Sequence, residues 1–217
     1  MFNRTVLVLG ATGQTGQRVV KALVDKGIAV RVLVRNAQKA EAVRVANVEI
    51  RIGDLANEAD LRAGFDGVGA VISALGGTME ARPEDREFIE HKIFETLERL
   101  ATEYKLEQVV MCSSMGTETP EAIPFLTTVL RMKRRAELIL ENGRVPYTIV
   151  RPGGLVNDPG GQDVAVARNQ AVGGRVSRDD VAEVLVQALL QPEARNKIVE
   201  MVQQDGAGKA NRAHLFA

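Results

Sequence analysis

A glycine-rich segment near the start of the chain limits its fold more than any other feature. Gly10-Ala-Thr-Gly13-Gln-Thr-Gly16 stands between an apolar run typical of a buried strand, Thr5–Leu9, and a helical pattern over residues 17–26. Such a loop is typical of dinucleotide binding. Its glycines permit a tight turn, a close approach of backbone to a pyrophosphate, and close packing of the helix on the strand. A plain turn followed by a helix cap is the alternative.

Strand-like and helix-like segments go on alternating beyond this loop. Such alternation predicts an α/β fold: a single Rossmann-type domain over residues 1–217, with a doubly wound parallel sheet and helices on both faces. Residues 153–174 read as an irregular segment that could cover a site, and residues 203–217 as an irregular tail. The expected strands are 29–34, 48–52, 70–73, 108–112, 147–150 and 196–202, and the expected helices are 58–64, 83–104, 125–142 and 177–190.

Charge and cysteine content argue against several other classes of protein. The 28 Lys and Arg residues balance the 28 Asp and Glu residues without a block of like charge, which disfavours a nucleic-acid or membrane-surface partner. No apolar run reaches the roughly 20 residues of a membrane span, and the first residues lack the features of a signal peptide, so we expect a cytoplasmic protein. Cys112 and two distant histidines predict neither a disulfide nor a metal site.

The residue after the second expected strand indicates which dinucleotide binds. NAD-specific folds carry an acid there that holds the ribose 2′-hydroxyl, whereas this chain has Arg35. A guanidinium can pair with a 2′-phosphate and stack on adenine, so we expect NADP(H) as the cofactor. An ordinary surface arginine is the alternative. The pyrophosphate contacts would come from the loop residues Gly10, Thr12, Gly13, Gln14, Thr15 and Gly16.

The ends of the third and fourth expected strands supply further candidate contacts. Asp54 could accept a hydrogen bond from the adenine amino group while Leu55 packs on the ring, although an Asp turn or a helix cap explains Asp54 as well. The small segment Ala74-Leu75-Gly76-Gly77 would let the backbone lie against the ribose and pyrophosphate, or it forms an ordinary turn.

Motifs farther along the chain occur in a recognisable order. Together with the segments above, they resemble an atypical short-chain dehydrogenase/reductase, of the group that includes the NmrA-like proteins and the biliverdin IXβ/flavin reductases. The resemblance covers nearly the whole chain. The further motifs are Ser113-Ser114, Lys133 with Ala136-Glu137, Tyr147-Thr-Ile-Val-Arg151-Pro152-Gly153-Gly154-Leu155, and Val176-Ser177-Arg178-Asp179-Asp180-Val181-Ala182.

The resemblance implies roles for residues near the nicotinamide, with one departure. Dehydrogenases of this superfamily use a tyrosine, four residues before a helical lysine, as the general acid; here Val129 stands at that place before Lys133. Lys133 would still bind the nicotinamide ribose, and Ser114, beside the cofactor contact Ser113, would donate a hydrogen bond near the nicotinamide or the acceptor. A solvated cationic run is the alternative for Lys133, and a plain strand end is the alternative for Ser113-Ser114.

The resemblance also places the segment after the sixth strand against the carboxamide end of the cofactor. Its candidate contacts are Pro152, Gly153, Gly154 and Leu155, a composition that suits a rigid loop in close contact with a ligand. Gly153-Gly154 stand where some flavin reductases carry a histidine, which puts a histidine-assisted step in doubt.

The missing tyrosine makes some classes of hydride acceptor less suitable than others. A ketone would become a basic alkoxide without a proton donor, whereas a flavin, quinone or tetrapyrrole spreads the incoming charge and takes its proton from water. Our first hypothesis is an NADPH-dependent reductase of a small conjugated acceptor, the second an NmrA-like NADP(H)-binding sensor or scaffold with a protein partner, and the third a nucleotide-sugar epimerase or dehydratase. An apolar wall for the acceptor, or simple core packing, explains Phe125, Leu126, Val129 and Leu130.

Overall fold

The computed structural model describes residues 2–76, 87–168 and 173–217, and a mostly parallel sheet of eight strands runs through it. The strand order is β3-β2-β1-β4-β5-β6-β10-β8, in which only β8 is antiparallel to its neighbour. This arrangement confirms the predicted Rossmann-type α/β fold. The strands are β1 (Thr5–Leu9), β2 (Val30–Val34), β3 (Val48–Ile52), β4 (Val68–Ser73), β5 (Gln108–Cys112), β6 (Tyr147–Pro152), β8 (Val164–Ala167) and β10 (Lys197–Gln203).

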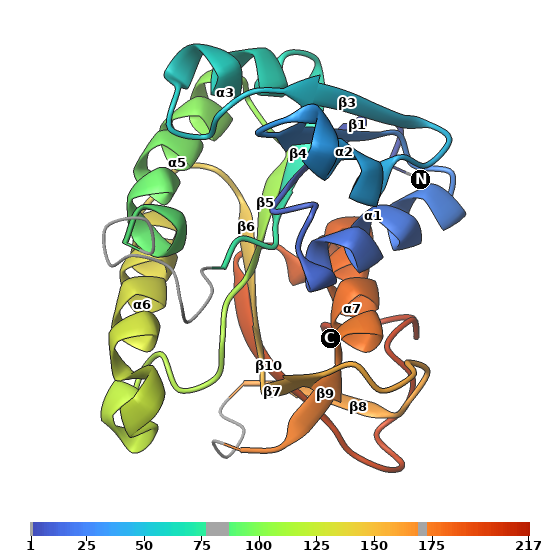
Figure 1. Cartoon of the computed structure of the whole chain (residues 1–217). Helices are drawn as coiled ribbons and strands as arrows, with labels where there is room; N and C mark the ends of the chain where they lie inside the picture. Colours follow the sequence, from blue (N-terminus) through green and yellow to red (C-terminus); the bar gives the residue numbers. More distant parts are fainter. Residues whose placement is uncertain (1, 77–86, 169–172) are drawn as a thin grey trace.

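Helices cover both faces of the sheet (Figure 1). On one face lie α1 (Gln14–Asp25) and α7 (Arg178–Leu190), which pack against each other and against the sheet. On the other lie α3 (Glu58–Phe65), α5 (Ile93–Glu103) and α6 (Thr127–Glu141). Alternate residues of each strand point to opposite faces, so Val6 and Val8 enter one core while Leu7 and Leu9 enter the other.

Short elements complete the chain. A four-residue helix, α2 (Ala37–Ala40), follows β2, and 3-10 turns occur at Glu41–Val43, Pro120–Ala122, Pro124–Leu126 and Pro192–Ala194. A π-helical turn, Phe88–Lys92, leads into α5, so the helix expected over 83–104 is described only from residue 87 onward. Its first residues, like Gly77, lie outside the described part of the chain.

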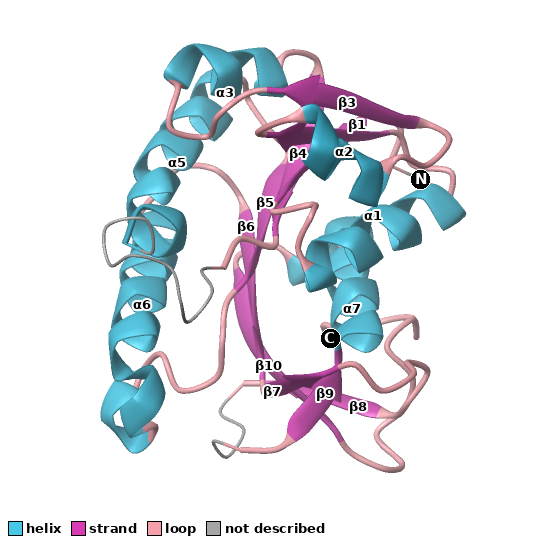
Figure 2. Cartoon of the chain, viewed as in Figure 1, coloured by secondary structure: helices cyan, strands magenta, loops and turns pink. Residues whose placement is uncertain are grey.

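Two expectations about irregular segments were incomplete. Within residues 153–174 the chain forms β7 (Gly154–Val156) and the edge strand β8, and β7 pairs with β9 (Arg175–Ser177) in a separate two-stranded sheet (Figure 2). The tail after residue 203 has turns rather than regular structure, yet Leu215 and Phe216 are buried in the core on the α1/α7 face. Apolar burial therefore fixes the tail without periodic secondary structure.

Candidate cofactor site

The sheet order brings the predicted cofactor segments into one row. Parallel strands end at the same edge of a sheet, and neighbouring strands lie about 4.8 Å apart. The neighbours β3, β2, β1, β4, β5 and β6 therefore carry the segments that follow them side by side along the carboxyl edge. In that order the row consists of Gly53–Leu55, Arg35, Gly10–Gly16, Ala74–Gly76, Ser113–Ser114 and Pro152–Leu155.

The glycine loop closes tightly at the centre of this row. Gly10 has a φ of +74°, and a β-carbon there would lie 2.6 Å from the carbonyl oxygen of Ala74. A β-carbon on Gly16 would lie 2.1 Å from the carbonyl oxygen of Gly10. Both positions therefore require glycine: Gly10 for the turn and for contact with the end of β4, and Gly16 for packing of α1 on the loop.

The first turn of α1 is suited to an anion. Gly13 is its N-cap, no side chain caps the helix, and its first turn contains no acidic residue. The N–H groups at a helix start point outward and the helix dipole makes this end positive, which together favour a phosphate. These residues fit the pyrophosphate of a dinucleotide, with Thr12, Gln14 and Thr15 around it.

Arg35 lies directly after β2 and is exposed. Among the described residues no hydrogen bond or ion pair holds its guanidinium, while the neighbouring Asn36 caps α2 by accepting a hydrogen bond from the Lys39 N–H at 2.9 Å. The guanidinium is thus available to a ligand on the β3 side of the glycine loop, where adenosine would lie.

Asp54 forms the turn that sequence reasoning offered as the alternative to adenine binding. Its Oδ1 accepts a hydrogen bond from the Ala56 N–H at 2.9 Å, and its own N–H donates to Asp60 Oδ2 at 2.9 Å. The Asp54 side chain is nevertheless exposed at the edge of the sheet, and Leu55 is half-buried against the α3/α5 core.

The β4 end approaches the glycine loop from the other side. The Ala74 N–H donates to the Leu9 carbonyl at 2.9 Å, Leu75 is buried, and Gly76 is exposed. The backbone of this segment is therefore fixed against the loop, as a wall for the ribose and pyrophosphate would require.

Ser113 belongs to a buried polar cluster that sequence reasoning missed. Its hydroxyl donates to Glu137 Oε1 at 2.5 Å, and the Arg151 guanidinium donates to both oxygens of the same carboxylate at 3.0 and 2.8 Å. Glu137 is fully buried, and Thr117 also donates to it at 3.2 Å. The cluster ties α6 to the ends of β5 and β6. No local pattern in the sequence links Glu137 to Arg151.

Ser114 and Lys133 occupy different environments from each other. Ser114 is half-buried and its hydroxyl donates only to the adjacent Met115 carbonyl, at 3.1 Å, within the described residues. Lys133 is buried, with 9% of its surface exposed, although Arg131 and Arg135 in the same run are exposed, so the solvated alternative does not hold for Lys133 itself. Val129 precedes it by one turn and is half-buried.

Around the start of α6 the apolar residues divide into two groups. Leu130 is fully buried, so core packing explains it, whereas Phe125 is 77% exposed. Leu126 is half-buried. Phe125 is therefore not a core residue and is free to contact a ligand.

The segment after β6 is held by main-chain hydrogen bonds. The Gly153 N–H donates to the Met201 carbonyl, the Gly154 N–H donates to the Gly174 carbonyl, and the Pro152 carbonyl accepts from Met115. A β-carbon on Gly153 would lie 2.8 Å from the Gly174 carbonyl oxygen. Contact with Gly174, the residue before β9, thus accounts for Gly153, and Leu155 is 36% exposed.

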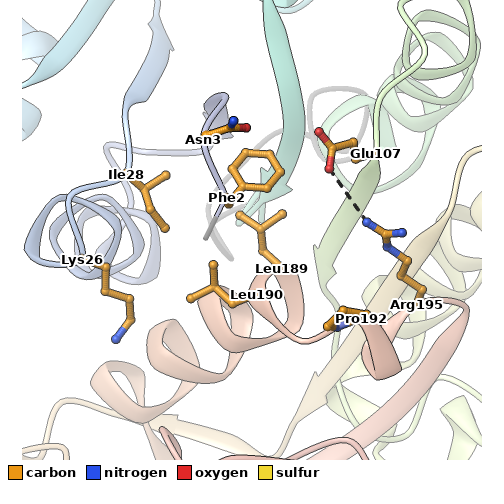
Figure 3. A pocket seen from close by; sticks show the side chains of 9 residues that line it. All are labelled: Phe2, Asn3, Lys26, Ile28, Glu107, Leu189, Leu190, Pro192 and Arg195. Carbon is orange, nitrogen blue, oxygen red and sulfur yellow. Dashed lines mark ion pairs between the residues drawn. The ribbon is translucent and has the colours of Figure 1, made fainter.

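A cavity lies at the opposite edge of the sheet. It has a volume of about 500 Å³ and lies among residues at the amino ends of strands and the carboxyl ends of α1 and α7. Figure 3 shows Lys26 on one side and the Glu107–Arg195 ion pair on the other. Because the glycine loop and the other predicted segments lie at the carboxyl edge, this cavity is separate from the candidate cofactor site.

The described part of the chain contains no group of three or more His, Cys, Asp or Glu side chains that could hold a metal ion. Nor does any of its helices have the length and apolar character required to cross a membrane.

Comparisons with known proteins agree with the geometry. Residues 10–192 match the model of a family described as NAD(P)H-binding. An uncharacterized chloroplastic protein of Arabidopsis thaliana is 37% identical, over 99% of this chain and 82% of that protein. Sanguinarine reductase of Eschscholzia californica is 30% identical, over 96% and 92% of the two chains. A candidate NAD-dependent epimerase/dehydratase from Bacillus halodurans has a similar structure, with a TM-score of 0.87 and 27% identity over 96% and 97% of the two chains.

Proposed function

Because the chain belongs to the NAD(P)H-binding family, we propose that it is an NADPH-dependent reductase of a flat, conjugated small-molecule acceptor. Family membership confirms the class of cofactor expected from the glycine loop, and Arg35 favours NADP(H) within that class. When bound along the carboxyl edge, NADPH supplies a hydride at the end of the row near Ser114.

The residue at the position of the missing tyrosine carries this proposal. Val129, one turn before the buried Lys133, has no proton to donate. Reduction of an isolated ketone would leave a strongly basic alkoxide that needs a positioned acid. A conjugated acceptor spreads the charge and takes its proton from water, so this chain has only to bind and orient it.

Phe125 and Ser114 supply the means to orient such an acceptor. An aromatic ring that is 77% exposed loses water contact when a flat ring system packs on it. The Ser114 hydroxyl, which among the described residues donates only to its neighbour Met115, can turn to donate to an acceptor oxygen or nitrogen. The likeness to sanguinarine reductase over nearly the whole chain supports a reductase of this kind.

Direct hydride transfer from NADPH to the acceptor can be tested by an oxidation assay. NADPH oxidation is followed with FMN, menadione, biliverdin and sanguinarine, and with cyclohexanone as an unconjugated control. We expect oxidation with at least one conjugated acceptor, none with cyclohexanone, and a primary deuterium isotope effect from only one of the two C4-deuterated forms of NADPH. Oxidation of cyclohexanone, or turnover without an isotope effect from either form, would contradict the proposal.

A matched pair of variants locates the acceptor. Phe125→Ala should raise the KM for the acceptor and leave the Kd for NADPH unchanged. Val45→Ala, which removes another exposed apolar side chain after α2, should change neither.

The lack of a tyrosine hydroxyl at position 129 also favours a second function, an NADP(H)-dependent sensor or scaffold. Val129 is compatible with a protein that binds the cofactor without turnover. Tight NADPH binding with no oxidation of any acceptor would favour this function. Interconversion of a nucleotide sugar without net NADPH consumption would favour an epimerase instead.

A further inference from the structure

Arg178, the first residue of α7, lies at the nicotinamide end of the candidate cofactor site. Its Nη1 donates to Asn157 Oδ1 at 3.0 Å and to the Leu155 carbonyl at 3.4 Å. Leu155 belongs to the segment that follows β6, and α7, which Arg178 begins, packs against both β5 and β6. The guanidinium therefore lies near the ends of β5 and β6, beyond the glycine loop.

The charge of Arg178 has no carboxylate partner among the described residues. The nearby Arg18, in the first turns of α1, pairs with Asp179 through an Nε–Oδ1 contact of 2.7 Å. Burial lowers the pKa of Arg178, and repulsion from Arg18 lowers it further. A guanidinium nevertheless stays protonated at neutral pH, and among the described residues no carboxylate pairs with the positive charge of Arg178.

An acidic group on a ligand would compensate the positive charge of Arg178. A partly buried cation without a counter-ion is unfavourable, and an anion placed beside it gains both charge attraction and hydrogen bonds from the guanidinium fork. The uncapped first turn of α1, which contains no acidic residue, lies beside the start of α7 and adds to the preference for an anion, whereas α7 is capped by Ser177 and carries Asp179 and Asp180 in its own first turn. Two of the hydrogen-bonding nitrogens of Arg178, Nε and Nη2, have no acceptor within the described part of the chain.

We infer that Arg178 forms an anion-binding subsite for the acceptor, and that the acceptor carries a carboxylate or a phosphate as well as its conjugated ring system. This inference rests on the proposed reductase function and narrows its substrate class. An exclusively structural role, in which Arg178 only links α7 to Leu155 and Asn157, makes no distinction between charged and neutral acceptors.

FMN and riboflavin test the subsite because they share one ring system and differ by a phosphate. Both are assayed with NADPH-saturated protein, so that the cofactor occupies the Arg35 region. We expect Arg178→Gln to raise the KM for FMN about tenfold, the typical cost of one charge-assisted hydrogen bond, while the KM for riboflavin changes less than about twofold. Arg195→Gln removes the same charge at the opposite edge of the sheet and should alter neither value.

A second measurement uses the unaltered protein and does not depend on how the variant folds. The KM for FMN should rise with ionic strength while that for riboflavin stays nearly constant, because salt screens a charge pair at a partly exposed site. Equal salt dependence for the two flavins would overturn the subsite.

Binding separates failure of the subsite from failure of the reductase function. Quenching of flavin fluorescence by NADP+-loaded protein gives a Kd for each flavin without turnover. Tighter binding of FMN than of riboflavin, lost in Arg178→Gln, would support the subsite even if neither flavin is reduced. Equal binding of the two flavins, or no binding of FMN, would overturn the subsite whatever the turnover.

Discussion

A β-carbon added to Gly16 would lie 2.1 Å from the carbonyl oxygen of Gly10, so the first turn of α1 rests directly on the loop that precedes it. Gly13 differs, because its φ is −75° and a β-carbon there would meet only Gly10, at 3.3 Å. The two glycines thus have separable roles, one in packing and one at the surface that would face the pyrophosphate.

This difference predicts opposite results for two alanine variants. Gly16→Ala should lower the free energy of unfolding by at least about 1–3 kcal/mol, the usual cost of overpacking. Gly13→Ala should leave the stability of the cofactor-free protein nearly unchanged but weaken NADP+ binding at least about tenfold, because its methyl group stands where the backbone approaches the pyrophosphate. Urea unfolding and calorimetry measure the two quantities. A Gly13→Ala variant with unaltered NADP+ affinity would contradict the assignment of the loop.

The exposed guanidinium of Arg35 predicts how the protein discriminates between dinucleotides. Arg35→Ala should raise the Kd for NADP+ about 10- to 100-fold, since a hydrogen bond between charged groups contributes about 1.5–3 kcal/mol, and should change the Kd for NAD+ far less. Lys39→Ala, at a nearby exposed position, serves as the control and should have a small effect. Equal losses for both dinucleotides would show that Arg35 does not contact the 2′-phosphate.

The buried Glu137–Arg151 pair predicts a large loss of stability when one partner is removed. Glu137→Gln removes the buried carboxylate that pairs with Arg151 and, among the described residues, leaves the guanidinium only Glu118, at 2.9 Å, and Glu200, at 3.8 Å; breaking a buried pair of this kind typically costs about 3–5 kcal/mol. Glu121→Gln breaks the exposed Arg131–Glu121 pair and should cost less than about 1 kcal/mol. Urea unfolding of both variants gives the comparison, and similar losses would mean that the buried cluster does not hold α6 on the sheet.

Asp180 predicts a pH dependence of stability. Its carboxylate is buried near the start of α7 and accepts hydrogen bonds from the N–H groups of Gly161 and Gln162, at 2.7 and 3.3 Å. Burial raises the pKa of this carboxyl above its usual value of 3.8, and the two hydrogen bonds oppose the shift only in part. The protonated group therefore contributes stability at low pH that is lost as the pH rises through the folded-state pKa.

The variant Asp180→Asn does not titrate, so it isolates this contribution. The free energy of unfolding of the natural chain minus that of the variant should fall as the pH rises from about 3.8 toward neutrality. The variant also loses one hydrogen-bond acceptor oxygen, which changes its free energy of unfolding by the same amount at every pH. A difference that rises over this range would mean that the charged form is the stabilised one.

The fold and the order of the site were predictable because their signals are local. The glycine loop and the apolar runs each depend on residues close in sequence, and the parallel order of the strands then aligns Arg35, Gly10 and Ser114 along one edge. Strands β7 and β9 escaped prediction since each has only three residues, beside glycines. The same holds for the buried tail, because Leu215 and Phe216 are fixed only by distant core residues.

The polar contacts of the site were less predictable than its backbone. Pairing of Glu137 with Arg151 joins a helix to a strand, and a sequence pattern contains no distance between the two. The sequence left two roles open for Asp54, adenine binding and a turn. Its hydrogen bond from the Ala56 N–H shows the turn. Lys133 lies in a run of cationic residues, and the sequence alone does not tell which of them is buried. The packing of α6 on the sheet determines that it is Lys133.

Calorimetric titration of the purified, cofactor-stripped protein with NADP+ and NAD+ tests the central claim most directly. Binding along the carboxyl edge predicts heat and thermal stabilisation with NADP+, with a clear preference over NAD+ that disappears in Arg35→Ala. Neither heat nor stabilisation with any nicotinamide dinucleotide would contradict the assignment of the site.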